Sequence, residues 1–423
     1  MSVRLGSMRI LIVTIADLPE GGGHTSRLKT LARCLARQGH AVRIWSKHVL
    51  GHAPRELIRL QGEVDGIPYE IVSGRTTRTY GARSLFMKVR TTLRLIVRLI
   101  RARNDVDVMW LNELSFHDML PMMLLGRLFG ITLIQSYEDE HIATCSERAL
   151  TWKQRLFTGV DNRLADRFLV RRADAVVVIS HYLKDKFAAC GANRLTVVPT
   201  IVDLDFWRCD PPPPDARPRI FYSGSFMDIY ALDETIAALG ELKAEGLDFE
   251  FHCIGNLRKP TPDLERVLRL REQNGLTDVM TFGDLVPLQQ VKQEIERSSV
   301  LLSIRKDSRL SRSGLSTKLS EYLASGRPVI TSVVGDVPVY LRDGESAFLL
   351  ENPTQDAIQQ ALRTCLTDPD TVRRIAAGGL AAAERHFGFA AVGRTLDRLL
   401  GGVGPGTARA GTGTPSGSGA EAP

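Results

Sequence analysis

Long apolar runs are absent from this 423-residue sequence. A helix that spans a bilayer needs about 20 apolar residues, and the best stretch, 121–134, is interrupted by Arg127. The start of the chain also lacks the basic segment and the small-residue cleavage site of a signal peptide. These absences predict a cytoplasmic protein that is not integral to a membrane.

Cysteine is scarce and scattered, and it has no paired spacing. The six cysteines are Cys34, Cys145, Cys190, Cys209, Cys253 and Cys365. Such spacing argues against both a disulfide framework and a zinc site. Reduced and mostly buried thiols are expected instead.

The chain is too long for one hydrophobic core, so two domains are expected. Apolar segments of strand length alternate with helical patterns, which is typical of parallel sheets covered by helices. Proline-rich 206–218 cannot continue this pattern. The predicted fold is α/β, with two doubly wound Rossmann-like domains facing across a cleft. The predicted segments are a first domain at 1–205, a linker at 206–218, a second domain at 219–385, a helix at 386–400 that packs back on the first domain, and a disordered tail at 401–423.

The individual strands can be placed from the apolar segments. In the first domain they are expected at 9–15, 41–45, 106–111, 132–136, 175–179 and 196–198, and in the second at 219–223, 249–254, 279–282, 300–303 and 329–332. Ligands bind beyond the carboxyl ends of parallel strands, so the space between the two domains is the default site.

A glycine-rich turn follows the first expected strand. Gly21, Gly22 and Gly23 precede a helix expected at 25–38, where the backbone can approach a ligand and the helix N-terminus favours an anion. The spacing is not that of the dinucleotide fingerprint. An ordinary strand-to-helix turn is the alternative.

A stronger pattern lies in the second half. Five cations follow a buried strand within fourteen positions, against one acid, Asp307; they are Arg305, Lys306, Arg309, Arg312 and Lys318. A helix is expected from Thr317 to Ser325, capped by Ser316 or Thr317 and ended by Gly326. Lys318 and Glu321 then share one face, about 4.5 Å apart along the axis. This face suits a diphosphate and paired hydroxyls, although a solvated face with an ordinary Lys–Glu pair has the same spacing.

Residues 313–330 read Ser-Gly-Leu-Ser-Thr-Lys-Leu-Ser-Glu-Tyr-Leu-Ala-Ser-Gly-Arg-Pro-Val-Ile. This stretch resembles the donor-site motif of the retaining family 4 glycosyltransferases, which have the GT-B fold. Further matching segments occur in the expected order over roughly residues 8–400, at 38–42, 178–180, 198–203, 221–225, 254–256 and 282–286.

The resemblance implies roles for individual residues. Glu321 would accept the ribose hydroxyls of a nucleotide sugar, Lys318 would contact its diphosphate, and the loop Gly283–Val286 would hold its base. The residues expected to bind the donor are Gly22, Gly23, Gly224, Ser225, Gly283, Leu285, Val286, Arg305, Arg312, Ser316, Thr317, Lys318 and Glu321.

Three departures from the family pattern change these expectations. Ser313 stands where the family often has another Glu, and no basic residue follows Ser225 until Lys243, so the diphosphate must rely on Lys318 with Arg305 or Arg312. Where many relatives have a histidine near the sugar, the sequence reads Ser-Tyr-Glu-Asp-Glu-His over 136–141. Glu138 or Asp139, rather than His141, is therefore expected to face the sugar and, with Lys318, to be catalytic. A solvated acidic loop is the alternative.

The resemblance further implies retention of anomeric configuration without a metal or other cofactor, the nucleotide diphosphate sugar being a co-substrate. Departure of the nucleoside diphosphate would be assisted by cations. Asp105 and Asp107, like Asp203 and Asp205, mimic an Asp-x-Asp metal motif, but neither pair follows a strand of the second domain, 219–385, which the resemblance implies binds the donor. A nucleotide-sugar epimerase or hydrolase, or a catalytically silent partner subunit, would use the same donor features.

The stretch from Arg75 to Arg103 has nine Lys or Arg and no acid. Within it, 84–103 has a helical pattern with Val89, Leu93, Ile96, Val97 and Ile100 on one side and Arg90, Arg94, Arg98 and Arg101 on the other. Such a helix can lie against anionic lipid, which would place the protein at the inner face of the membrane and favour a lipid-linked glycan acceptor. A core-packed helix with a solvated basic face is the alternative. Nucleic acid is not expected, because no aromatic residues are interleaved with the charges.

Overall fold

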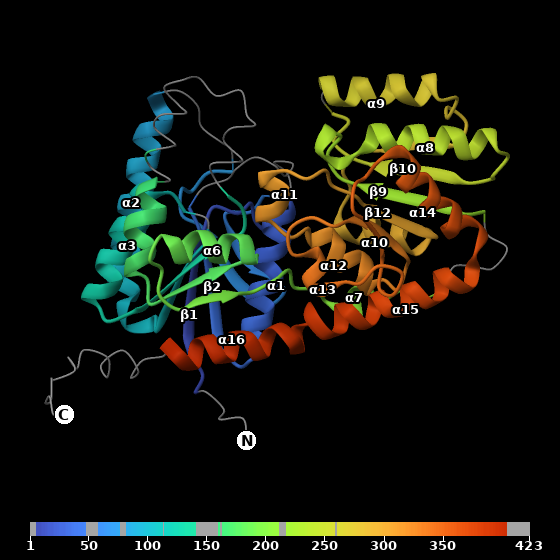
Figure 1. The fold of residues 1–423 in the computed structure, drawn as a ribbon. Helices are drawn as coiled ribbons and strands as arrows, with labels where there is room; N and C mark the ends of the chain where they lie inside the picture. Colours follow the sequence, from blue (N-terminus) through green and yellow to red (C-terminus); the bar gives the residue numbers. More distant parts are fainter. Residues whose placement is uncertain are drawn as a thin grey trace, which may run out of the picture.

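Two α/β domains lie next to each other in the computed structural model (Figure 1). It describes residues 6–47, 58–76, 82–112, 114–140, 163–210, 217–258 and 260–403, together with residue 160, and only the backbone of 82–85. His141, the proline run 211–214 of the expected linker and the expected tail beyond residue 403 lie outside the described residues. Both domains have a sheet of mainly parallel strands covered by helices, which confirms the predicted α/β fold class.

The first domain has an eight-stranded sheet in the order β3-β4-β2-β1-β5-β6-β7-β8. Its strands are β1 (Arg9–Thr14), β2 (Ala41–Ser46), β3 (Gln61–Val64), β4 (Ile67–Ile71), β5 (Val108–Asn112), β6 (Thr132–Tyr137), β7 (Ala175–Val178) and β8 (Leu195–Val197). Its helices are α1 (Gly23–Arg37), α2 (Ala82–Ala102), α3 (Phe116–Leu128) and α6 (His181–Ala189), with short turns at Arg103–Asp105, Ala165–Leu169 and Val170–Arg172. Every residue of β5 and β6 is buried, as expected of parallel strands covered on both faces.

The β3–β4 hairpin is absent from the strands expected from the sequence. These strands pair antiparallel and are joined by Asp65 and Gly66, which both have positive φ. An Asp-Gly pair is a strong signal for such a two-residue turn. It was missed because β3 is mostly polar and exposed, so it forms no apolar run.

The second domain has a six-stranded parallel sheet in the order β11-β10-β9-β12-β13-β14. Its strands are β9 (Arg219–Ser223), β10 (Glu250–Ile254), β11 (Met280–Gly283), β12 (Val300–Ser303), β13 (Val329–Ser332) and β14 (Phe348–Leu350). Its helices are α8 (Leu232–Ala244), α9 (Pro262–Gln273), α10 (Leu288–Glu296), α11 (Arg309–Ser313), α12 (Thr317–Ala324), α13 (Val337–Tyr340), α14 (Gln355–Thr367) and α15 (Pro369–His386), with a short turn at Asp228–Tyr230. The three-residue edge strand β14 was too short to be predicted.

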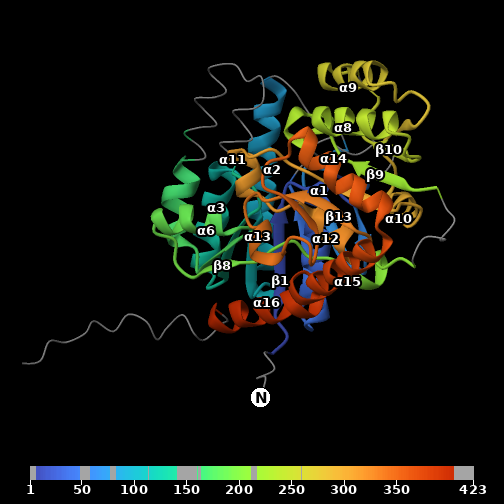
Figure 2. The same cartoon turned by 45° about the vertical axis from the view of Figure 1, so that its right-hand side comes forward.

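The two domains are connected at both their core and their base. One apolar cluster contains side chains from both sheets, including Met109 and Leu133 of the first and Phe221 and Leu301 of the second. After the short helix α7 (Leu204–Trp207) the chain enters the second domain, and it returns through α15 and α16 (Phe389–Val403). Figures 1 and 2 both show α16 beneath the first sheet, and its apolar side chains join the core under α1.

Helix α2 forms where the basic segment was expected, but it packs through a different face. Its buried side chains are Met87, Thr91, Leu95 and Leu99. The side expected to be apolar and core-facing is largely exposed; its exposed members are Val89, Leu93, Val97 and Ile100, joined by Phe86. The alternative interpretation, in which Val89, Leu93, Val97 and Ile100 pack against the core, is therefore wrong. The helix has a second apolar row, and that row is the buried one.

Candidate functional site

Helix α12 holds the two residues that the sequence singled out. It begins at Thr317 after Ser316, whose backbone is extended but whose side chain makes no cap hydrogen bond, and it ends before Gly326, where φ is +74°. The first turn contains no acid. Its N-terminal amides and Lys318 therefore contribute positive potential at the same place.

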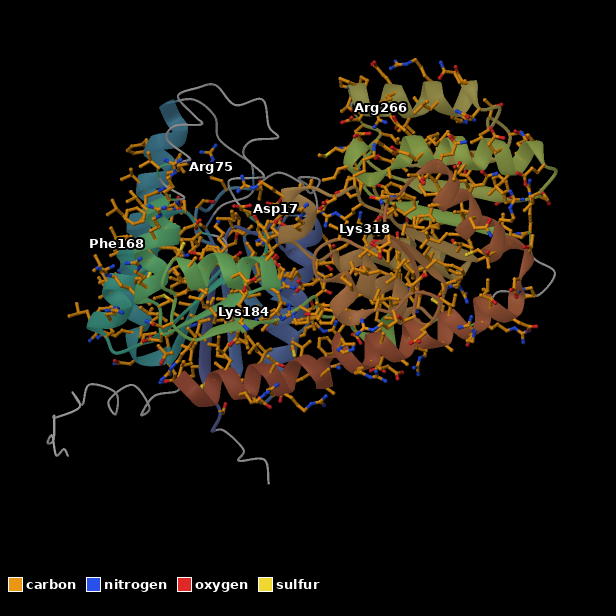
Figure 3. All side chains as sticks on the ribbon, viewed as in Figure 1. Asp17, Arg75, Phe168, Lys184, Arg266 and Lys318 are labelled. Carbon is orange, nitrogen blue, oxygen red and sulfur yellow. The ribbon has the colours of Figure 1, made fainter. Side chains whose placement is uncertain are left out.

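The ammonium group of Lys318 lies in a pocket of aromatic rings. Its Nζ is 5.7 Å from the ring centroid of Tyr222 and 5.4 Å from that of Tyr230. Gly224 leaves room for it, since a Cβ at this glycine would lie 2.6 Å from Nζ. Burial, and then the nearby charge of Arg305, lower the pKa of Lys318 to about 8. Figure 3 shows Lys318 on the side of the second domain that faces the first.

The other three cations of this segment, Lys306, Arg309 and Arg312, are each paired with acidic side chains. Lys306 Nζ is 2.7 Å from Asp228 and 2.8 Å from Glu234, and Arg309 Nη2 is 2.8 Å from Glu140. Arg312 is exposed, and its Nε donates to Asp307 over 2.6 Å.

Arg305 and Lys318 differ from these three cations. Neither forms an ion pair with any described residue, and the buried Nε of Arg305 has no hydrogen-bond partner among them. The structure thus brings Arg305 to Lys318 and does not bring Arg312 to them.

Glu321 lies one helical turn beyond Lys318 and reaches the first domain. Its Oε1 is 3.5 Å from the Oγ of Ser26 on α1. Burial raises the pKa of Glu321 to about 7, while Lys318 and Ser26 act in the opposite direction. The carboxylate is therefore located where the two domains meet.

The glycine turn after β1 faces the same helix. A Cβ at Gly23 would lie 3.7 Å from Thr317 Oγ1, and one at Gly22 would enter open space. At Gly21 a Cβ would lie 2.1 Å from Thr25 Oγ1. This turn therefore needs glycine for its own packing, and it brings the backbone close to the N-terminus of α12.

The loops expected to bind the donor through Gly224, Ser225 and Gly283–Val286 follow β9 and β11, which flank β10 in the sheet. Gly224 donates its N–H to Ile254 O over 2.8 Å, and Gly255 donates to Gly283 O over 3.0 Å, so the ends of β9, β10 and β11 are held together. Ser225 O accepts a hydrogen bond from the hydroxyl of Tyr222. In the next loop Leu285 is 47% exposed, whereas Val286 packs against the core.

The acidic loop after β6 also lies at the domain junction. Glu138 is buried and Asp139 is exposed. Asp139 Oδ1 would lie 2.7 Å from a Cβ at Gly314, and the Glu140 N–H donates to Ser313 Oγ over 3.3 Å. The loop therefore contacts the segment that leads into α12.

Ser313, which replaces an expected Glu, is part of this junction. It is fully buried, and its carbonyl accepts a hydrogen bond of 2.6 Å from Ser180 Oγ. A second contact joins the domains nearby, where His181 Nδ1 lies 2.9 Å from Asp336 Oδ2. Ser313 thus joins the two domains through its carbonyl and its hydroxyl.

Three residues of α1 at this junction were missed by sequence reasoning: His24, Ser26 and Arg27. His24 Nδ1 lies 3.2 Å and Arg27 Nε 3.3 Å from the carboxylate of Glu138. The only signal was their place directly after the glycine turn. Their partners lie more than 100 positions away, at Glu138 and Glu321.

The two Asp-x-Asp sequences are occupied in structural contacts. Asp107 accepts hydrogen bonds from the side chain and the N–H of Arg9, and it lies before β5, at the opposite edge of the sheet. Asp203 pairs with Arg33. In the described part of the chain no group of three His, Cys, Asp or Glu could hold a metal ion, and no helix there is long and apolar enough to cross a membrane.

Comparisons with known proteins agree with this arrangement. A Glycosyl transferase 4-like domain matches residues 22–200, and Glycosyl transferases group 1 matches residues 217–368. A GDP-mannose-dependent alpha-(1-6)-phosphatidylinositol monomannoside mannosyltransferase of Mycolicibacterium smegmatis is 26% identical over 333 residues, 72% of this chain and 80% of the relative.

Solved structures show the same fold at low identity. A sucrose-phosphate synthase from Thermosynechococcus elongatus superposes with a TM-score of 0.69 at 16% identity, over 93% of this chain and 98% of the other. HepE of Anabaena in complex with UDP and glucose gives 0.68 at 14% identity, over 93% and 99%. The two matched domains and the shared architecture show that the chain belongs to the group 1 glycosyltransferases and has the GT-B fold.

Proposed function

We propose that the protein transfers a sugar from a nucleotide diphosphate sugar to a glycan, lipid-linked or small-molecule acceptor, with retention of anomeric configuration and without a metal ion. The observation that supports this most is the pair Arg305 and Lys318. Two cations that repel each other at a helix N-terminus and form no ion pair with any described residue favour a bound dianion. A diphosphate matches this charge.

The other donor contacts follow from the same placement. Glu321 lies one turn farther along α12, where its carboxylate can accept paired hydroxyls of a ribose. The backbone at Gly22 and Gly23 would lie over the phosphates, and the loop Gly283–Val286 would hold the base. The named relatives include a GDP-mannose-dependent enzyme and a UDP complex, so the proposal leaves the choice of base open.

In the proposed reaction the bond between the sugar C1 and the diphosphate oxygen breaks, and its electron pair leaves with the nucleoside diphosphate. Arg305, Lys318 and the first amides of α12 stabilise that negative charge, which is greater in the transition state than in the bound donor. The acceptor hydroxyl forms the new bond to C1 on the same face, and its proton passes to the departing phosphate. Glu138 would lie near the positive charge that develops on the sugar.

Donor binding is the first test. A panel of nucleotide sugars is screened for thermal stabilisation, which only ligands of the folded state produce. Glu321→Ala should remove most of the shift, because the ribose hydroxyls lose a buried partner. A loss of affinity below about twofold in calorimetry would count against the role of Glu321, and Glu272→Ala on the exposed end of α9 is a matched control.

Transfer is the second test. Release of nucleoside diphosphate should require an acceptor and persist in EDTA, and the product should keep the donor's anomeric configuration by NMR. Release without acceptor would indicate a hydrolase or epimerase. No donor binding would indicate a silent subunit.

A membrane contact through α2 is proposed on separate grounds. Phe86, Val89 and Leu93 are 68%, 54% and 57% exposed and line a groove of about 900 Å³ between α2 and the β3–β4 hairpin. Arg90 and Arg101 flank it, are exposed, and have no ion pair with any described residue. An exposed apolar row with arginines suits an anionic lipid surface, and a lipid-linked acceptor would be reached there.

The structure selects the residues for the test. Arg94 and Arg98 are poor choices, because both hold α2 in place. Arg94 donates to Ser73 O over 2.9 Å, and Arg98 pairs with Glu70 at 2.5 Å. The double variant Arg90→Glu, Arg101→Glu should lose co-sedimentation with anionic liposomes. Arg269→Glu, Arg394→Glu on α9 and α16 makes the same charge change at other exposed sites and should keep it. Equal binding by both variants would contradict the proposal.

A further inference from the structure

A closed ring of hydrogen bonds lies at the carboxyl edge of the first sheet. Thr14 Oγ1 donates to Asn112 Oδ1 over 3.0 Å, and Asn112 Nδ2 donates to Glu138 Oε1 over 3.0 Å. Glu138 Oε2 is 3.2 Å from His24 Nδ1, and His24 Nε2 is 3.3 Å from Thr14 Oγ1. The ring joins the ends of β1, β5 and β6 to the start of α1.

The chemistry of the four groups sets the direction of each bond. The amide of Asn112 gives its two protons to Glu138 and to Ser136 Oγ, so its oxygen accepts the single hydroxyl proton of Thr14. Thr14 must then accept from His24, which requires a proton on Nε2. An ionised carboxylate only accepts, so Nδ1 of His24 carries a proton as well. The ring thus requires His24 to be an imidazolium.

A second cation holds the same carboxylate. Arg27 Nε is 3.3 Å from Glu138 Oε1, and the guanidinium donates to Val198 O over 2.8 Å and to Pro199 O over 2.9 Å. Glu138 therefore accepts from Asn112, Arg27 and His24, which come from two different elements. Both of its oxygens are fixed, and the side chain is buried.

The ring borders the proposed donor site on two sides. Gly23, next to His24, lies against Thr317 at the start of α12, and Asp139, next to Glu138, lies against Gly314. Glu138 is thus one residue away from one contact with the second domain, and His24 is one residue away from the other.

We propose that His24 is a positioning residue for sugar transfer. Its imidazolium fixes the Glu138 carboxylate in the orientation that stabilises the positive charge developing on the sugar as the nucleoside diphosphate departs, so that no reorganisation is needed as the bond breaks. The inference rests on the proposed transferase function, and it assigns to α1 a part in the reaction that the donor motif does not contain.

Substitutions can distinguish the roles of the two imidazole nitrogens of His24. In His24→Asn the amide N–H can replace Nδ1–H toward Glu138, whereas in His24→Gln it can replace only Nε2–H toward Thr14. His24→Ala should lower kcat about 100-fold and change donor KM less than about threefold, since the diphosphate contacts remain. His24→Asn should recover most of the loss, and His24→Gln should not. His117→Ala, on the half-exposed start of α3, should keep the kcat of the unsubstituted protein.

NMR supplies a readout that does not depend on turnover. In the full chain labelled with 15N-histidine, both ring nitrogens of His24 should be protonated at neutral pH. Glu138→Gln should convert Nδ1 to an acceptor, because the Gln amide can donate to it. An unprotonated Nε2, an unchanged kcat in His24→Ala, or equal kcat in the Asn and Gln variants would overturn the inference. If the unsubstituted protein bound donor but transferred nothing, the proposed function would fail, while the NMR result would still decide whether the ring exists.

Discussion

The charged groups that the two domains bring to the site differ in whether they are paired. In the second domain, Arg305 and Lys318 form no ion pair with any described residue, and their mutual repulsion contributes to the low pKa of Lys318. In the first domain, Glu138 is held by Asn112 and by two cations. A cluster without partners costs stability until a ligand compensates it, whereas a fully paired carboxylate is already oriented. The first arrangement favours binding and the second favours catalysis.

Removing the charge of Glu138 should give the largest effect and test the catalytic side of this comparison. Glu138→Gln keeps a side chain of the same shape in the ring, so folding should be retained. We expect kcat to fall about 10²- to 10³-fold, because a preorganised charge at the reacting centre is lost. Donor affinity, measured by calorimetry, should change little. A large loss of affinity with unchanged kcat would reverse the assignment of the two halves.

Replacing Lys318 tests whether the second domain binds the diphosphate. Lys318→Ala should weaken the affinity for a nucleoside diphosphate roughly 10- to 100-fold, the effect of one charge-assisted hydrogen bond to a phosphate. The free nucleoside should bind the variant and the unsubstituted protein equally, since it lacks the diphosphate. Equal losses for both ligands would show that the substitution had damaged the domain rather than the anion site.

The pH dependence of donor binding should follow the two shifted groups of α12. Lys318, with its pKa lowered to about 8, loses its charge above that pH, and Glu321, with its pKa raised to about 7, loses its charge below that pH. Affinity should therefore be highest between these values and fall by up to about tenfold per pH unit on either side. Lys318→Arg should remove the alkaline fall, because the guanidinium stays charged. A flat calorimetric profile from pH 6 to 9 would contradict this account.

Removing the contact between Ser26 and Glu321, which joins the two domains, should give the smallest effect. Ser26 Oγ lies 3.5 Å from Glu321 Oε1, at the limit of a hydrogen bond. Ser26→Ala should change donor affinity less than about threefold, measured in the same titration as Lys318→Ala. A tenfold loss would mean that Ser26 acts on the ligand directly and that the two halves are not separate in function.

The local sequence was sufficient to predict helix α12 but not the edge strands of the two sheets. The bounds expected for α12 differ from the observed ones by one residue, because Gly326 and the apolar spacing both act within one short segment, although the expected Ser316 cap makes no side-chain hydrogen bond. Edge strand β3 lacks an apolar run and β14 has only three residues, so each forms by pairing with a neighbouring strand. Helix α2 shows the same limit, since it has two apolar rows and only the tertiary fold selects the one that is buried.

By itself the sequence determined the α/β architecture and the placement of Lys318 and Glu321 on one face of a helix, since both follow from periodicity and from spacing of three residues. Only the tertiary structure decided which cations remain for a ligand. Lys306 is paired with Asp228, 78 positions away, whereas Arg305 beside it has no such partner. The structure alone also closed the ring from Thr14 to Glu138. Long-range pairing depends on how strands are ordered in the sheet, and no local pattern in the sequence encodes that order.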